Sequence, residues 1–496
     1  MGSSWFPISL FLVLPLFCNS VFGNKQIESV QTARDGILEA INWAQGMTTK
    51  FYSEDDDGIT SSNELINIVA IGDCLKLYED SEHLLSRLVS SSVNFSRDDA
   101  VTWLSAAMAS HRSCLDGLED KGLKYETESA RNLSNLLREA LSSVKQQRHF
   151  GNSRSYGIPR ITAQDQFWGV LASWDAAKWK ADIVVAQDGS GNHRSINEAV
   201  SALAKMGRNR PGRAIIYVKS GIYHEKVEIE RNLENVMFVG DGMDRTVVTG
   251  YGNVHDGAST ISSATFGVSG NGFWARDITF ENTAGPEKHQ AVALRVASDL
   301  SVFYRCSFKG YQDTLLVHSL RQFYRDCHIY GTQDFIFGDA SAVFQNCDIF
   351  VRKPMDHQSN LITAQGRDNP EQNTGISILN SRVSPASDFR PVISRFKSYL
   401  GRPWKKYSRT VFIKTDLDGL VDPQGWKEWS GDFALSTLYY AEFMNRGYGA
   451  FTVNRVKWPG YHVLRDYGEA SQFSVKNFIQ GHYWIPATGV PYWADV

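Results

Sequence analysis

Three short segments of the sequence share one pattern: FYRCSF at 303–308, YRDCHI at 324–329 and FQNCDI at 344–349. Cys306, Cys327 and Cys347 follow one another at steps of 21 and 20 residues, each with an aromatic residue three positions before it. Looser copies begin at Phe273 and Ile378. A strand-and-turn unit of ~20 residues that repeats at nearly constant spacing predicts a right-handed parallel β-helix. Strands of a β-sandwich would not recur at constant spacing.

The first third of the chain has a different period. From about residue 24 to residue 147, apolar residues recur at spacings of three, four and seven, which is typical of amphipathic helices. One helix is expected over 64–89, and Ser96 followed by Asp99 forms a capping box for the next. Four helices with short loops predict an all-α up-and-down four-helix bundle. Cys74 and Cys114 lie on two of these helices and could form a disulfide.

The chain begins with an apolar segment, 6–17, followed by Val21-Phe22-Gly23, which suits a signal-peptidase site. We therefore predict a signal peptide at 1–23, a bundle at 24–150, a linker at 151–180 and the β-helix at 181–496. A buried N-terminal helix is the alternative for 1–23, because residues 1–5 contain no Lys or Arg. No later run approaches ~20 apolar residues, so we expect a secreted, extracellular protein that does not span a membrane. Asn94 and Asn132 begin glycosylation sequons.

The net charge also differs between the two predicted domains. The 496 residues contain 51 basic and 54 acidic side chains, a formal net charge of −3. This near balance argues against a protein that binds nucleic acid. Residues 1–160 are acidic (15 basic, 20 acidic) and residues 161–496 slightly basic (36 and 34).

The repeat also brings two carboxylates together. Asp313 and Asp334 are separated by 21 residues, as are Cys306 and Cys327, so we expect both aspartates at equivalent places on adjacent coils, ~4.8 Å apart. Two like charges this close do not both ionise easily, so one pKa should rise while the other stays low. This separation suits an acid beside a base or nucleophile. Each aspartate taken alone would more simply be a cap or a turn residue.

Four further side chains complete a candidate catalytic site. Gln312 precedes Asp313, and Gln290 lies 22 residues earlier, so two amide donors would face a developing oxyanion. A structural glutamine ladder is the alternative. Arg402 could keep an aspartate ionised, and Trp404 offers a flat face to a sugar ring, although a surface loop would also explain Arg402-Pro403-Trp404. The motifs of serine hydrolases and zinc enzymes are absent from the sequence.

At these residues the sequence resembles the pectin methylesterase family of carbohydrate esterases. The stretches that match lie in order along the predicted solenoid: KHQAVALR at 288–295, GYQDTL at 310–315, GTQDFIFG at 331–338 and LGRPW at 400–404. The helical region is similar to the pectin methylesterase inhibitor domain that plant-type members carry as a pro-region.

The resemblance implies a role for each candidate residue. Asp334 would be the nucleophile on the C6 methyl ester of galacturonate, and Gln312 with Gln290 would stabilise the oxyanion. Asp313 would protonate methanol and later take a proton from water. Thr260 and Gln290 match substrate contacts, and Arg402 and Trp404 match the polymer groove.

The resemblance also implies the surroundings of the enzyme. It pairs Cys74 with Cys114 and Cys327 with Cys347, and it implies no metal or organic cofactor. The expected partners are methyl-esterified homogalacturonan (pectin) in the cell wall and a possible proteinaceous inhibitor, with the enzyme a monomer. Gln333, Asp339 and Ile261 differ from the family's usual residues, and the basic processing motif usual at the domain junction is missing.

Two other functions compete with the esterase. Glycosidases and lyases built on β-helices also act on pectin with paired carboxylates, and a retaining glycosidase would need its carboxyls ~5 Å apart. The atypical pro-region instead suits an inactive protein that binds pectin or inhibits other enzymes.

Overall fold

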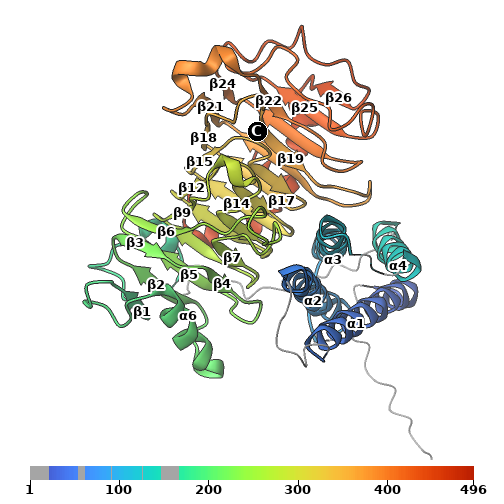
Figure 1. Ribbon diagram of the computed structural model, residues 1–496, viewed down its shortest axis with the longest axis vertical. Coiled ribbons are helices and arrows are strands. Elements are labelled where there is room, and N and C mark those ends of the chain that lie inside the picture. Colours follow the sequence, from blue (N-terminus) through green and yellow to red (C-terminus); the bar gives the residue numbers. More distant parts are fainter. Residues whose placement is uncertain (1–21, 54–61, 91, 124, 126, 147–166) are drawn as a thin grey trace, which may run out of the picture.

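The computed structural model describes residues 22–53, 62–90, 92–123, 125, 127–146 and 167–496. A bundle of four helices lies beside a long solenoid of parallel strands, with α2 and α3 on the side that faces the solenoid (Figure 1). Most of the predicted signal peptide, 1–23, lies outside the described residues, as does 151–166 of the predicted linker.

The bundle has the predicted four helices, α1 (Asn24–Ser53), α2 (Ser62–Val89), α3 (Arg97–Asp120) and α4 (Thr127–Gln146). α1 packs on α2 and α4, and α3 also packs on both of those helices, which is the up-and-down arrangement. The predicted capping box is present, because Ser96 Oγ accepts from Asp99 N and Asp99 Oδ2 accepts from Ser96 N. The Cys74–Cys114 disulfide joins α2 to α3 in the bundle core, as predicted.

The solenoid consists of three parallel sheets, to which most coils contribute one strand each. The first sheet contains β1 (Ile183–Val185), β2 (Ala214–Val218), β5 (Val236–Val239), β8 (Trp274–Arg276), β11 (Ser301–Tyr304), β14 (Arg321–Arg325), β17 (Ser341–Gln345), β20 (Gly375–Leu379), β23 (Arg409–Ile413), β25 (Tyr439–Phe443) and β26 (Tyr461–Val463). The second contains β4 (Val227–Ile229), β7 (Phe266–Val268), β10 (Leu294–Val296), β13 (Leu315–Val317), β16 (Ile336–Gly338), β19 (Asn360–Gln365) and β22 (Ser398–Gly401). The third contains β3 (Gly221–His224), β6 (Thr246–Gly250), β9 (Thr279–Asn282), β12 (Ser307–Lys309), β15 (His328–Gly331), β18 (Asp348–Val351), β21 (Arg382–Pro385) and β24 (Asp416–Leu417).

The strand register confirms the sequence repeat and the right-handed parallel β-helix. Phe303 pairs with Tyr324, and Tyr324 pairs with Phe344, so the aromatic residues of the three copies stack inside the solenoid. Their ring centroids are 4.9 and 4.4 Å apart. This internal ladder belongs to a core that runs the length of the solenoid.

Short helices close the solenoid and cover one face. α6 (Ile196–Lys205) packs on the first coils. α5 (Val170–Ser173), α7 (Tyr467–Ser471) and α8 (Val475–Phe478) bury apolar residues against the outer face of the first sheet. The 3-10 helices are η1 (Gly207–Asn209), η2 (Pro286–Lys288), η3 (Arg390–Arg395), η4 (Gly481–Tyr483) and η5 (Ile485–Thr488).

The linker predicted at 151–180 is too long at its C-terminal end. Val170 and Leu171 are fully buried against the first sheet, and Arg276 Nη1 donates to the carbonyls of Leu171 (2.7 Å) and Ala172 (2.9 Å). The β-helix domain therefore includes residues from 167 onward. Its first apolar residues form one short helix without a repeat, so the sequence pattern did not reveal them.

The predicted Cys327–Cys347 disulfide is wrong: Cys306, Cys327 and Cys347 are all free, buried thiols. The Cys327 thiol instead donates to the carbonyls of Arg325 (3.3 Å) and Phe303 (3.4 Å). The strand spacing of ~4.8 Å lies within the Cα separations that a disulfide spans, so spacing alone allowed the bridge. The contacts of the Cys327 thiol with backbone carbonyls are what differ from the prediction.

Among the described helices, none is long and apolar enough to cross a membrane.

Candidate active site

Asp313 and Asp334 occupy equivalent places on adjacent coils, as the repeat predicted. Each lies two residues before a strand of the second sheet, and Leu315 of β13 pairs with Ile336 of β16. Both aspartates have left-handed backbones, with φ of 64° and 48°, a conformation that Asp tolerates better than most residues. Both are buried, and Asp313 N donates to the carbonyl of Gln333 (3.0 Å), which ties one coil to the next.

Arg402, which follows β22, distinguishes the two carboxyls. Its Nε donates to Asp334 Oδ1 (3.0 Å) and its Nη2 to Oδ2 (2.5 Å), a bidentate ion pair. Burial raises the pKa of Asp334, and the guanidinium opposes that rise. Burial and the neighbouring Asp334 charge raise the pKa of Asp313 well above its ordinary value. Asp334 is therefore the carboxyl that ionises first, and Asp313 the one that keeps its proton.

The two aspartates line a cavity of about 410 Å³. The structure brings every predicted catalytic and substrate-binding residue to this cavity: Thr260, Gln290, Gln312, Asp313, Asp334, Arg402 and Trp404. The register of β10 and β13, Leu294 to Leu315, places Gln290 one residue out of step with Gln312, yet both glutamines line the cavity. Two side-chain amides and two carboxyls therefore line one cavity.

Part of the cavity wall is apolar. Leu316, Phe337 and Ala364 line the cavity, and they belong to an apolar cluster with Ala264 and Val292 against which Trp404 packs. Gly366 makes room for the indole, because a Cβ at that position would lie 2.9 Å from Trp404 Cε3. An apolar wall with an aromatic ring at its edge is a surface on which a sugar ring can stack.

Sequence reasoning gave no role to several solenoid residues that line the cavity, among them Trp429 and Asp339. Trp429, 38% exposed, lies under Arg402, whose Cζ is 4.3 Å from the ring centroid. The signal was a tryptophan in a polar stretch shortly after LGRPW. Asp339 differs from the family's usual residue, and the sequence alone assigns it no partner. It accepts from Gln365 Nε2 (3.1 Å), Gln372 Nε2 (2.5 Å) and Thr374 Oγ1, and burial raises its pKa to about 7.

The bundle forms the other side of the cavity, which the sequence did not predict. Asp73 of α2 and Asp116, Glu119 and Asp120 of α3 line it. Lys405 Nζ lies 2.8 Å from Asp116 Oδ1, and Arg112 Nη2 lies 2.6 Å from Asp368 Oδ2. The active-site cavity is thus enclosed between the two domains.

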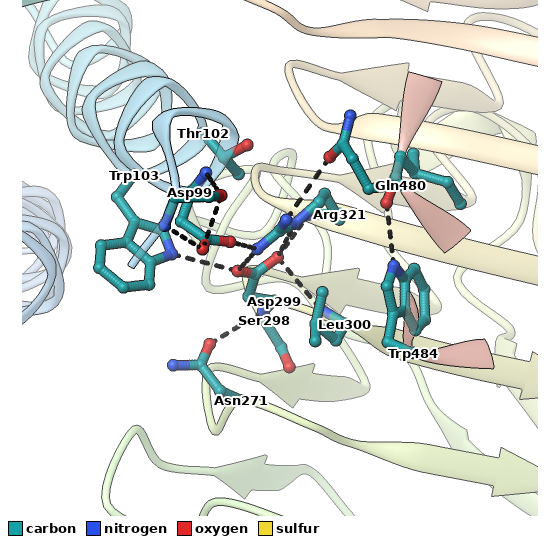
Figure 2. A network of polar contacts seen from close by, with 12 residues as sticks. Asp99, Thr102, Trp103, Asn271, Ser298, Asp299, Leu300, Arg321, Gln480 and Trp484 are labelled. Atoms are coloured by element: carbon teal, nitrogen blue, oxygen red, sulfur yellow. Dashed lines mark hydrogen bonds and ion pairs between the residues drawn. The ribbon is translucent and has the colours of Figure 1, made fainter. Parts of the chain in front are cut away.

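A buried charge network fixes the start of α3 against the solenoid (Figure 2). Arg321 of β14 donates to Asp299 through Nε (2.9 Å) and Nη2 (2.7 Å), and to Asp99 Oδ1 through Nη2 (2.6 Å). Trp103 Nε1 donates to Asp299 Oδ2 (3.1 Å). Asp99 therefore holds the capping box of α3 with one oxygen and the solenoid with the other.

Among the described residues, no group of three or more His, Cys, Asp or Glu side chains is placed to hold a metal ion.

Comparison with known proteins agrees with both halves of this architecture. Residues 182–482 match the pectinesterase family, and residues 14–144 match the plant invertase/pectin methylesterase inhibitor family. A probable pectinesterase/pectinesterase inhibitor 36 of Arabidopsis thaliana is 58% identical over 453 residues, covering 86% of this chain and 87% of that protein.

Two solved structures agree as well. The pectin methylesterase from carrot is 49% identical with a TM-score of 0.63, over 65% of this chain and all of that chain. A pectin methylesterase in complex with a hexasaccharide is 26% identical with a TM-score of 0.50, over 61% of this chain and 97% of that chain. This chain belongs to the pectinesterase family and carries an inhibitor-family domain before its esterase domain.

Proposed function

We propose that this protein hydrolyses the C6 methyl esters of galacturonate units in pectin, releasing methanol and pectate, with Asp334 as the nucleophile. The observation that carries the proposal is the stacked pair of buried aspartates, of which Asp334 alone is paired with Arg402. A pectin methylesterase that binds a hexasaccharide has the same fold, which supports homogalacturonan as the substrate.

The first half of the reaction uses both carboxyls. The ionised oxygen of Asp334 attacks the ester carbonyl carbon, and the carbonyl π electrons move to its oxygen. The side-chain amides of Gln312 and Gln290 donate to that oxyanion. When the oxyanion collapses, the bond to the methoxy oxygen breaks and the Asp313 proton moves to that oxygen. Methanol leaves, and an anhydride joins Asp334 to the sugar acid.

The second half restores the enzyme. Asp313, now ionised, takes a proton from a water molecule as that water attacks the sugar carbonyl carbon. The tetrahedral intermediate collapses by breaking the bond to Asp334, which leaves as a carboxylate. The new galacturonic acid releases its proton to solvent. Asp313 is again protonated and ready for the next ester.

A glycosidase or lyase remains the rival reaction, because paired carboxyls on a β-helix also suit those enzymes. Amide donors beside the nucleophile favour ester chemistry, which develops an oxyanion. Incubation with highly methylated pectin separates the two, with methanol measured against chain length. We expect methanol with no loss of chain length. Chain cleavage without methanol would establish the rival.

We also propose that the chain is exported to the cell wall as a monomeric glycoprotein. The Cys74–Cys114 disulfide suits an oxidising compartment, and the segment 1–23 carries the leader pattern. Asn94 and Asn132 are both exposed and therefore accessible for glycosylation. Mass analysis of the protein secreted by plant cells, before and after glycosidase treatment, would show each glycan as a mass loss.

The bundle supports a further role as an inhibitor of its own esterase domain. Its helices α2 and α3 line the cavity together with the aspartate pair, so a docked bundle would stand in the way of a polymer. A specific protease site inserted between α4 and Phe167 tests this role. Methanol release should rise after cleavage and dilution. Equal release before and after cleavage would exclude inhibition, and an inactive pectin-binding protein would release none in either state.

A further inference from the structure

The helical bundle contains a pocket of its own, which the catalytic scheme does not use. The pocket has a volume of about 170 Å³ and lies between α1 and α4. Its lining includes Gly36, Glu39, Trp43, Tyr125, Ser129 and Asn132. Helices α1 and α4 are on the side of the bundle away from the solenoid (Figure 1). The pocket is therefore accessible while the bundle is docked.

Two helix faces form this pocket. Gly36 lets α1 and α4 approach, because a Cβ at that position would lie 3.1 Å from the Cδ1 atoms of Leu133 and Leu136 on α4. Further along the same face of α1, Trp43 follows Gly36 at a spacing of seven residues. The close contact at Gly36 thus becomes an open groove beside the Trp43 side chain.

One wall of the pocket is aromatic. Trp43 is half-buried and packs on Tyr125, with the ring centroids 4.2 Å apart. Glu39 and Ser129 add a carboxylate and a hydroxyl to the lining. An indole beside polar groups suits a sugar, whose apolar face stacks on the ring while its hydroxyls form hydrogen bonds. The volume is below the range of about 300–1,000 Å³ that drug-sized ligands occupy, so the pocket suits a single sugar ring.

Asn132 brings a sugar to this pocket. It begins the glycosylation sequon Asn132-Leu133-Ser134, and its side chain is exposed whereas Leu133 is buried in the bundle core. An N-linked glycan is bonded to the side-chain nitrogen, so its first ring would start at the pocket wall that Asn132 forms. Asn94, which begins the other sequon, lies before α3 and does not line the pocket.

We infer that the first N-acetylglucosamine attached to Asn132 occupies this pocket and stacks on Trp43, which ties α4 to α1. The inference rests on the glycosylation proposed above, and it is independent of the esterase function. In the attachment, Asn132 Nδ2 bonds to C1 of the sugar, the lipid pyrophosphate of the donor leaves with the electrons of the C1–O bond, and the amide loses one proton. The Cys74–Cys114 disulfide joins α2 to α3, so the sugar would add a tie between the other two helices.

The test compares wild-type protein with Asn132→Gln, Trp43→Leu and the double variant, all secreted by plant cells that keep their glycans in the high-mannose form. Asn94→Gln is the matched control, because it removes a glycan that has no pocket. A fifth sample is native wild-type protein treated with endoglycosidase H, which leaves one N-acetylglucosamine on each asparagine. The readout is hydrogen exchange of backbone amides in α1 peptides over 36–47, followed by mass spectrometry.

Loss of the Asn132 glycan should speed exchange in α1 about fivefold, the effect of losing one ring contact. Trimming to one sugar should leave the exchange rate at the wild-type value, and so should Asn94→Gln. In the Trp43→Leu background, Asn132→Gln should have no further effect, because the contact has already been lost. Trp43→Phe, which keeps a ring, should retain part of the glycan effect.

Two results would overturn the inference. One is an equal effect of Asn132→Gln in the wild-type and Trp43→Leu backgrounds. The other is a sample trimmed to one sugar that exchanges as fast as Asn132→Gln. The trimmed sample has an unaltered Trp43, so this comparison holds even where Trp43→Leu weakens the bundle.

Mass measurement separates failure of the glycosylation from failure of the pocket. A peptide that contains Asn132 and carries no glycan mass would refute both the modification and the proposed occupant. A glycosylated Asn132 whose loss leaves exchange in α1 unchanged would refute the pocket alone.

Discussion

At the residue scale, Asp313 and Asp334 differ chiefly in the guanidinium of Arg402. The nucleophile must be ionised and the proton donor must be protonated. Activity should therefore rise as pH rises through the pKa of Asp334, and fall as pH rises through the higher pKa of Asp313. We expect a bell-shaped profile of kcat/KM against pH, measured by methanol release from the cleaved chain.

Arg402→Gln tests whether the acid limb of the pH profile reports the ionisation of Asp334. The substitution removes the charge that lowers the pKa of Asp334, so the acid limb should move to higher pH. Arg382→Gln is the matched control, since its guanidinium stays on the solenoid after cleavage, pairs with Asp348 and should leave the acid limb in place. An acid limb that stays fixed in Arg402→Gln would assign it to another group.

The aspartate pair was predictable because strand register converts a separation of 21 residues into neighbouring positions. Trp429 was not predictable, because it lies in a bend between β24 and β25, outside the repeating strands. Asp339 accepts hydrogen bonds from three residues of the next coil, Gln365, Gln372 and Thr374. They were not predictable, because no spacing rule fixes which side chains of that coil point inward.

At the element scale, the stack of three cysteines makes a chemical prediction. The structure keeps Cys306, Cys327 and Cys347 as thiols in the dry core of the solenoid. Peptide mapping without reduction, after alkylation in denaturant, should find all three alkylated and one disulfide peptide joining Cys74 to Cys114. A peptide pair that joins Cys327 to Cys347 would restore the disulfide implied by the family resemblance.

The sequence predicted that Asp99 caps α3, but it did not predict that Asp99 also forms an ion pair with the solenoid. Asp99 is recognisable as a capping residue from a local pattern, whereas its ion pair with Arg321 depends on how two domains dock. Asp99 binds an N-terminal backbone N–H of α3 and a solenoid cation at once. The formation of the first turn of α3 and the docking of the bundle on the solenoid are therefore coupled.

Arg321→Met measures how much the buried network of Arg321, Asp99 and Asp299 stabilises the protein. The substitution leaves Asp99 and Asp299 buried without their cation, which costs about 3–5 kcal/mol of unfolding free energy. Asp99→Asn leaves Arg321 paired with Asp299 and should cost less, about 1–2 kcal/mol. Arg231→Met removes a half-exposed pair with Glu79 at the same interface and should cost at most about 1 kcal/mol.

Urea unfolding followed by circular dichroism and tryptophan fluorescence gives these values. The account requires the order Arg321→Met, then Asp99→Asn, then Arg231→Met. Equal costs for the three variants would mean that the buried network holds the bundle no better than the surface pairs.

At the scale of the whole molecule, periodicity predicted both domains but not their contact. Acidic residues near the end of α3 have the pattern of a solvated helix face, yet Asp116, Glu119 and Asp120 line the cavity. The contact is largely polar: the bundle core takes in Leu320 and packs against Ile261 of the solenoid, and ion pairs supply much of the rest. A hydrophobic pattern does not reveal an interface of this kind.

The polar interface combines contacts of two strengths. Its half-exposed ion pairs contribute little each and weaken with salt. The buried pair of Arg321 and Asp99 contributes more, so separation of the domains requires that this pair be broken.

The central claim is that Asp334 is the nucleophile of an esterase. The direct measurement is methanol release and chain length in one reaction on highly methylated pectin, with the cleaved wild-type protein and its Asp334→Asn variant. We expect wild-type methanol without shortening, and a loss of at least about 10³-fold in Asp334→Asn with the fold unchanged by circular dichroism. Methanol release by Asp334→Asn at a rate near wild type, or shortening of the polymer, would contradict the account.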